Sequence, residues 1–163
     1  MSAIGSPVRP VVLPFFIVYD VLFFVFALGV LGFAGQKRAV RVLGGLLVAY
    51  GALNFVAIFT PEHLGETATS LSNTTHIVAA GLTTLLFLLQ LGLGAAAFGK
   101  KFRVYSLGTL VTVLVLGVYI FSVVNAGQLP LFVGVTERIL IYGYMLWVAV
   151  LAVVLLRGQV QPT

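Results

Sequence analysis

Residues 11–33 read VVLPFFIVYDVLFFVFALGVLGF and contain a single charged side chain, that of Asp20. A helix needs about 20 apolar residues to cross the hydrocarbon core of a bilayer, where an unpaired backbone amide costs several kcal/mol. The stretch has that length, and Pro14 falls in its opening turn, where a missing amide hydrogen does least harm. Because the run is longer than the core of a signal peptide, we predict a retained transmembrane helix.

Four further stretches are also long and apolar enough to form transmembrane helices. They are residues 42–59, 75–98, 104–124 and 136–156. Turn and capping residues separate the stretches, such as the Ser/Thr/Asn-rich residues 70–74. No stretch alternates polar and apolar residues with the period of a transmembrane β-barrel. The sequence therefore predicts an all-α fold, a polytopic transmembrane bundle of five helices that forms a single domain over residues 1–163.

The composition excludes several classes of protein. Of the 163 residues, 61% are hydrophobic and 8% are charged, whereas a soluble domain carries about 25% charged residues. Nine Lys and Arg residues among long apolar runs are too few to follow a nucleic-acid backbone. The absence of cysteine excludes disulfides and thiolate chemistry. We expect the lipid bilayer as the main partner, no nucleic acid, no cofactor, and a multi-pass location in the cell membrane.

The basic residues are distributed unevenly between the two sides that five helices would define. One side carries seven of the nine, namely Lys37, Arg38, Arg41, Lys100, Lys101, Arg103 and Arg157. The other side carries Arg9 and Arg138 together with three glutamates. Positive residues favour the cytoplasmic side of a membrane. The asymmetry predicts an N-terminus outside the cell and a C-terminus in the cytoplasm.

Small residues indicate where helices pack, because lipid removes the hydrophobic drive for helices to associate. Gly45 and Ala49 are four residues apart in the second stretch, and Gly94 lies near the end of the third. Tyr144 and Trp147 are three apart and share a helix face, which favours packing over a chromophore site. We expect these residues to form close helix contacts.

Ionisable and polar side chains inside a membrane are costly and mark candidate functional sites. The candidates come from all five stretches, and all except Asp20 lie toward the outer side: Asp20, Asn54, His76, Tyr119, Glu137, Arg138 and Tyr142. We predict that they line an outward-facing polar pocket. Three interpretations of Asp20 stay open: a structural ion pair with Arg138, the handling of a proton or substrate, or exposure to a water-filled crevice without further role.

A metal site is a lesser alternative. It would need three or more converging ligands, for which the sequence offers Glu62, His63, Glu66 and His76. The chain has no His-Glu-x-x-His pattern, no Gly-x-Ser-x-Gly turn and no Walker-type phosphate loop. The sequence therefore gives no firm indication of an enzyme.

Three parts of the chain resemble one known family. They are residues 5–14 with 18–22, residues 59–62 with 75–78 and 95–100, and residues 134–139 with Trp147. The family comprises bacterial and archaeal integral membrane proteins grouped as a domain of unknown function, number 998. The resemblance implies a helical membrane fold and adds weight to Asp20, His76, Glu137 and Arg138 as site residues, but it implies no activity. It also implies one further N-terminal helix in other members, so a shortened or misassigned start is our hypothesis for residue 1.

Three functional hypotheses follow. The first is a non-enzymatic protein that binds a lipid or small apolar molecule in the outer polar pocket. The second is a proton-coupled transporter or transport accessory that uses Asp20; five helices are few for a transport path, so we expect a homo-oligomer in that case. The third is a membrane metal-dependent hydrolase.

Overall fold

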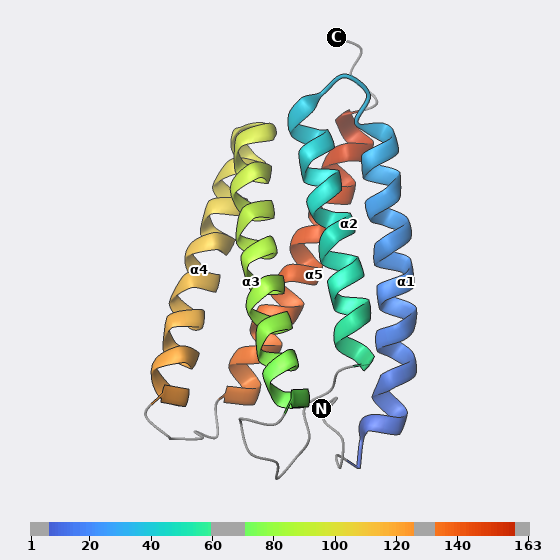
Figure 1. Cartoon of the computed structure of the whole chain (residues 1–163). Helices are drawn as coiled ribbons and strands as arrows, with labels where there is room; N and C mark the ends of the chain where they lie inside the picture. The colour runs from blue at the N-terminus through green and yellow to red at the C-terminus, as the bar shows by residue number, and fades with distance from the viewer. Residues whose placement is uncertain (1–6, 60–70, 126–132, 159–163) are drawn as a thin grey trace. The chain divides into compact units, whose positions relative to one another are not determined.

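The computed structural model describes residues 7–59, 71–125 and 133–158, and the chain is helical wherever regular structure occurs in these ranges. The five helices are α1 (Arg9–Phe33), α2 (Arg38–Phe59), α3 (Leu71–Ala97), α4 (Lys100–Asn125) and α5 (Val133–Gly158). Figure 1 shows these helices as ribbons. Each is long and apolar enough to cross a membrane. The predicted all-α class with five membrane-spanning helices is thus confirmed, while the inside–outside orientation of the termini stays a prediction.

The helices begin earlier than the apolar runs that predict them. α2 starts at Arg38 and α4 at Lys100, so basic residues form their opening turns. Lys and Arg are good helix formers, and a backbone entering the membrane must pair its own amides. Gly35, at φ +49°, makes the turn between α1 and α2, a left-handed conformation that glycine adopts at little cost.

The chain divides into two compact units, residues 1–90 and residues 91–163, and the division falls within α3. In the first unit α1 and α2 lie side by side along an antiparallel interface (Figure 1). Phe23, Ala27 and Leu47 are buried in this unit. Gly44 allows the closest approach, because a Cβ there would lie 2.8 Å from Leu31 Cα.

The prediction that Gly45 makes a close helix contact is wrong. A Cβ added to Gly45 would meet nothing within 4 Å, and the contact is made by its neighbour Gly44. One residue turns a helix by about 100°, so adjacent glycines face different surroundings. Hydropathy alone does not distinguish them.

A buried amide joins α2 and α3 in the same unit. The Gln90 Nε2 donates a hydrogen bond of 3.2 Å to the Leu46 carbonyl oxygen. Gln90 is fully buried, at 0% exposure. Hydrogen bonds of this kind fix neighbouring helices in a membrane, where water cannot compete for the amide.

The second unit is organised around Trp147, which is fully buried. Its ring stacks on Tyr144, with centroids 6.3 Å apart, which confirms the predicted packing of this pair. It also lies 5.7 Å from the Phe102 ring. Gly94 provides the space, because a Cβ there would lie 2.7 Å from Trp147 Cζ2. The predicted close contact at Gly94 is therefore confirmed.

Candidate functional site

The predicted site residues are shared between the two units. Asp20, Asn54 and His76 belong to the first, and Tyr119, Arg138 and Tyr142 to the second. The Glu137 side chain lies outside the described part of the structure, as do residues 62, 63 and 66. The convergence of all seven residues on one pocket stays a prediction, and so does the ion pair between Asp20 and Arg138.

Two of the predicted residues do come together, at the interface of α1 and α2. Asp20 is only 5% exposed. It interacts electrostatically with Tyr50, and the side chains of Tyr50 and Asn54 are hydrogen-bonded. Asp20 also interacts with its neighbour Tyr19. We call Tyr19, Asp20, Tyr50 and Asn54 the polar cluster.

Asp20 lies deep within its span, whereas Asn54 of the polar cluster lies about 8 Å from the end of α2 at Phe59. Asp20 is eleven residues after Arg9, where α1 begins, which corresponds to a rise of about 16 Å. At that depth in a bilayer an exposed carboxyl group is costly, and polar neighbours reduce the cost. The arrangement therefore places a buried carboxyl group beside two phenol groups within an apolar span.

The other predicted residues lie in different surroundings. His76 is half-buried in the second turn of α3. Tyr119 and Tyr142 are exposed, at 40% and 60%, on α4 and α5. Among the residues that the structure describes, no three His, Cys, Asp or Glu side chains form a group that could hold a metal ion. The metal alternative depends on residues 62, 63 and 66, which lie outside this range, so it stays a prediction.

Sequence reasoning missed Tyr50, Tyr19 and Gln90. Tyr50 precedes Asn54 by four residues, so the two share a helix face, and this spacing could have indicated the pair. Gln90 interrupts the run LLFLLQLGLG at residues 85–94. A single amide in such a run signals a buried hydrogen bond, because hydrocarbon leaves an isolated amide unsatisfied.

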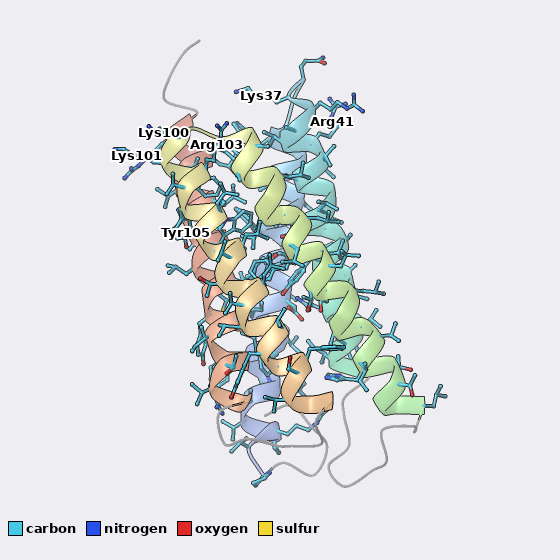
Figure 2. All side chains as sticks on the ribbon, turned by 90° about the vertical axis from the view of Figure 1, so that its left-hand side faces the viewer. Lys37, Arg41, Lys100, Lys101, Arg103 and Tyr105 are labelled. Atoms are coloured by element: carbon cyan, nitrogen blue, oxygen red, sulfur yellow. The ribbon has the colours of Figure 1, made fainter. Side chains whose placement is uncertain are left out.

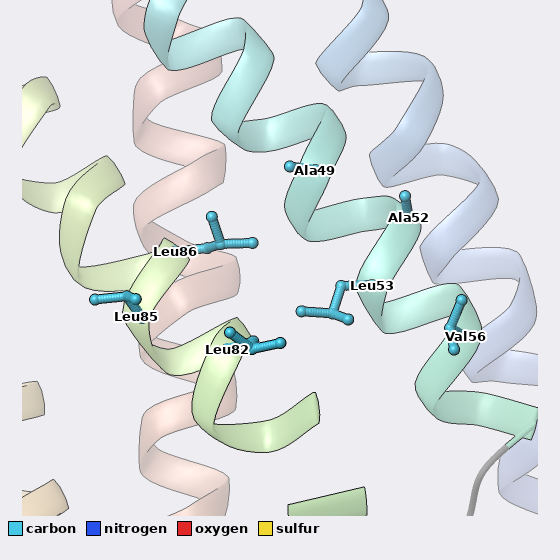
Figure 3. Close-up of a pocket in the computed structure, with 7 residues that line it drawn as sticks. All are labelled: Ala49, Ala52, Leu53, Val56, Leu82, Leu85 and Leu86. Atoms are coloured by element: carbon cyan, nitrogen blue, oxygen red, sulfur yellow. The ribbon is translucent and has the colours of Figure 1, made fainter. Parts of the chain in front are cut away.

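The structure also contains a hollow that the sequence did not predict. It has a volume of about 430 Å³ and lies between α2 and α3 within the first unit (Figure 3). Its walls are Ala49, Ala52, Leu53, Val56, Leu82, Leu85 and Leu86. Leu82 and Leu86 extend toward α2, and Leu53 extends toward α3 (Figure 3). We call this feature the α2–α3 hollow.

The lining of the α2–α3 hollow consists only of alkyl groups, and no polar side chain in the described ranges borders it. The hydrogen bond between Gln90 and Leu46 lies next to one end of the hollow, because Leu46 precedes the lining residues of α2 and Gln90 follows those of α3. Such a surface offers dispersion contacts and no group that could orient water or hold a charge. Among the residues that the structure describes, this lining can receive a hydrocarbon chain and supplies no acid, base or metal ligand.

Five apolar spans, a carboxyl group within the spans and an alkyl-lined hollow define a multi-pass integral membrane protein. The chain belongs to the family described as "Protein of unknown function (DUF998)", whose family model matches residues 1–154. The predicted family is confirmed. Comparison with curated proteins and with solved structures gives no match.

Proposed function

We propose that the protein binds lipid and that one acyl chain occupies the α2–α3 hollow. The observation that carries this proposal is the exclusively alkyl lining of a recess located within two membrane spans. Its volume of about 430 Å³ falls in the range of about 300–1,000 Å³ typical of small-molecule sites.

The favourable free energy of binding comes from the fit between the acyl chain and the α2–α3 hollow. An acyl chain leaves one hydrocarbon environment for another, so burial of apolar surface contributes little. An unfilled recess loses the dispersion contacts of its lining, and a chain that follows the recess restores them. Ala49 and Ala52 supply the narrow wall, because their side chains end at Cβ.

The depth of the hollow agrees with a chain from a single leaflet. From Ala49 to Val56, the first and last lining residues of α2, the helix rises about 11 Å, and one leaflet contributes about 15 Å of hydrocarbon. The hydrogen bond between Gln90 and Leu46 lies beyond the hollow. We place the end of the acyl chain next to this bond.

The proposed site differs from the polar pocket that the sequence suggested. Tyr50 and Asn54 of the polar cluster are about one turn apart on α2. Ala52 is turned from both by about 160°, and Val56 is turned from them by about 120–160°. α2 therefore presents the polar cluster on one face and the α2–α3 hollow on another. The acyl chain has no contact with Asp20 in this proposal.

The test is photo-cross-linking with a phospholipid that carries a diazirine on its acyl chain. We expect labelled peptides from α2 and α3 in the wild type and a loss of most labelling in Ala52→Phe, where the ring fills the hollow. Ala80→Phe is the matched control, because Ala80 is exposed on α3 and does not line the hollow. Equal labelling of Ala52→Phe and Ala80→Phe would contradict the proposal.

Proton-coupled transport is a second candidate, favoured by the burial of Asp20 within the polar cluster. A carboxyl group in such a setting binds and releases a proton with little competing water. In liposomes, solute uptake that follows a pH gradient and stops in Asp20→Asn would support this candidate. Uptake that persists in Asp20→Asn would remove it.

A further inference from the structure

Four cations lie at one end of the second compact unit. Lys100, Lys101 and Arg103 lie in the opening turns of α4, and Arg157 lies in the last turn of α5. α4 and α5 pack against each other and run in opposite directions, so these turns share one end (Figure 1). All four side chains are exposed, and Figure 2 shows three of them together. We call these four residues the basic end.

The second unit offers the basic end no acidic side chain. The only Asp or Glu among residues 91–163 is Glu137. It lies twenty residues before Arg157 on the same helix, which places its backbone about 30 Å away. Four like charges therefore repel one another there, and a bound anion would reduce this repulsion.

Arg103 is held in position at the basic end. Its Nε donates a hydrogen bond of 3.0 Å to the Ala95 carbonyl oxygen near the end of α3. The two terminal nitrogens keep their four N–H donors, which match the oxygens of a phosphate. Because the side chain is already fixed, binding an anion costs less conformational entropy than it would for a free arginine.

The location of the basic end at the end of a membrane span favours a phosphate that is attached to a lipid. Lys100 begins an apolar helix that is long enough to cross a membrane, so the basic end lies where lipid headgroups lie. Tyr105, half-buried and less than two turns further along α4, suits the membrane boundary, where tyrosine is enriched (Figure 2). A phosphate attached to a lipid meets this surface at high local concentration.

We infer that the basic end binds the phosphate group of an anionic phospholipid, with Arg103 as the positioned donor and Lys100, Lys101 and Arg157 as additional charges. This site is independent of the proposed acyl-chain site, which lies in the first unit between α2 and α3. The two proposals can therefore fail separately.

The experiment measures which lipid stays bound when the full chain is purified from mixed micelles of phosphatidylglycerol and phosphatidylcholine in equal amounts. We expect the wild type to retain phosphatidylglycerol in excess. In Lys100→Gln/Lys101→Gln the excess should fall by roughly fivefold for each cation removed. This variant keeps Arg103, which donates the hydrogen bond to Ala95, so we expect the helical circular dichroism of the wild type.

The matched control is Lys37→Gln/Arg38→Gln, which removes two exposed cations from the start of α2. We expect it to retain the wild-type excess. An equal loss in both double variants would show a general attraction between charges and would overturn the site. Inorganic phosphate is added in a separate arm at the same concentration as phosphatidylglycerol. Because a lipid phosphate is concentrated at this surface, we expect no displacement at equal concentration; displacement would identify free phosphate as the ligand and overturn the lipid assignment.

Discussion

Trp147 Nε1 donates a hydrogen bond of 2.9 Å to Ser106 Oγ, and both side chains are fully buried in the second unit. The bond joins α5 to α4 in the interior of the second unit. It satisfies the one donor of the indole, so a large aromatic ring can pack among apolar groups without an unpaired N–H.

Replacing this donor should destabilise the second unit. We expect Trp147→Phe to lower the free energy of unfolding by about 1–3 kcal/mol, because it leaves Ser106 without its partner and shortens the packed ring. Unfolding in mixed detergent micelles measures the change. Ser106→Ala should lower the free energy of unfolding less in the Trp147→Phe background than in the wild type. The reason is that the two residues share one hydrogen bond, which Trp147→Phe has already removed. Strictly additive losses would show that the bond contributes nothing.

Gly94 should not tolerate a methyl group. In Gly94→Ala the new Cβ would lie 2.7 Å from Trp147 Cζ2, and the rigid indole has little room to move. Overpacking of this kind costs about 1–3 kcal/mol. Gly92→Ala is the matched control, because a Cβ there meets nothing within 4 Å, and it should leave the melting temperature unchanged or raise it. A similar melting temperature for both variants would contradict the close contact between Gly94 and the indole.

Alanine substitutions at two adjacent glycines of α2 should have different effects on the melting temperature. Gly44→Ala places a Cβ 2.8 Å from Leu31 Cα, a backbone atom that cannot rotate away. We expect the variant to separate α1 from α2 and to lower the melting temperature in detergent. Gly45→Ala should be neutral or stabilising, because its Cβ has open space and alanine is the better helix former. The opposite ranking would show that α2 is rotated relative to α1.

Asp20 and Arg138 can be tested for a direct interaction by a double-mutant cycle. If the predicted ion pair exists, Asp20→Asn and Arg138→Gln should each destabilise the protein, and their combination should show a coupling of about 0.5–3 kcal/mol. The measurement is thermal unfolding in detergent at neutral pH. Strict additivity would exclude the pair and leave Asp20 to the polar cluster on α1 and α2.

The sequence was sufficient to predict the helices, because each span needs only length and apolar composition, both of which are local properties. It also identified Asp20 and Asn54, since polar residues within apolar runs are rare and visible. Their partner Tyr50 is less conspicuous, because tyrosine occurs in many spans without a polar role.

The sequence could not predict which of Gly44 and Gly45 contacts α1. It also could not predict the α2–α3 hollow. Both depend on how far one helix is rotated and shifted against the next. Ala49 and Ala52 leave a recess only because Leu82 and Leu86 face them from α3. Hydrophobic composition does not encode this register.

Trp147 is the only tryptophan of the chain, and it lies in the second unit. Intrinsic fluorescence excited at the indole therefore reports on that unit alone, without any label. A shift of the emission to longer wavelength during denaturation would follow the exposure of Trp147, while circular dichroism would follow all five helices. A difference between the two transitions would reveal whether the units unfold together or one after the other.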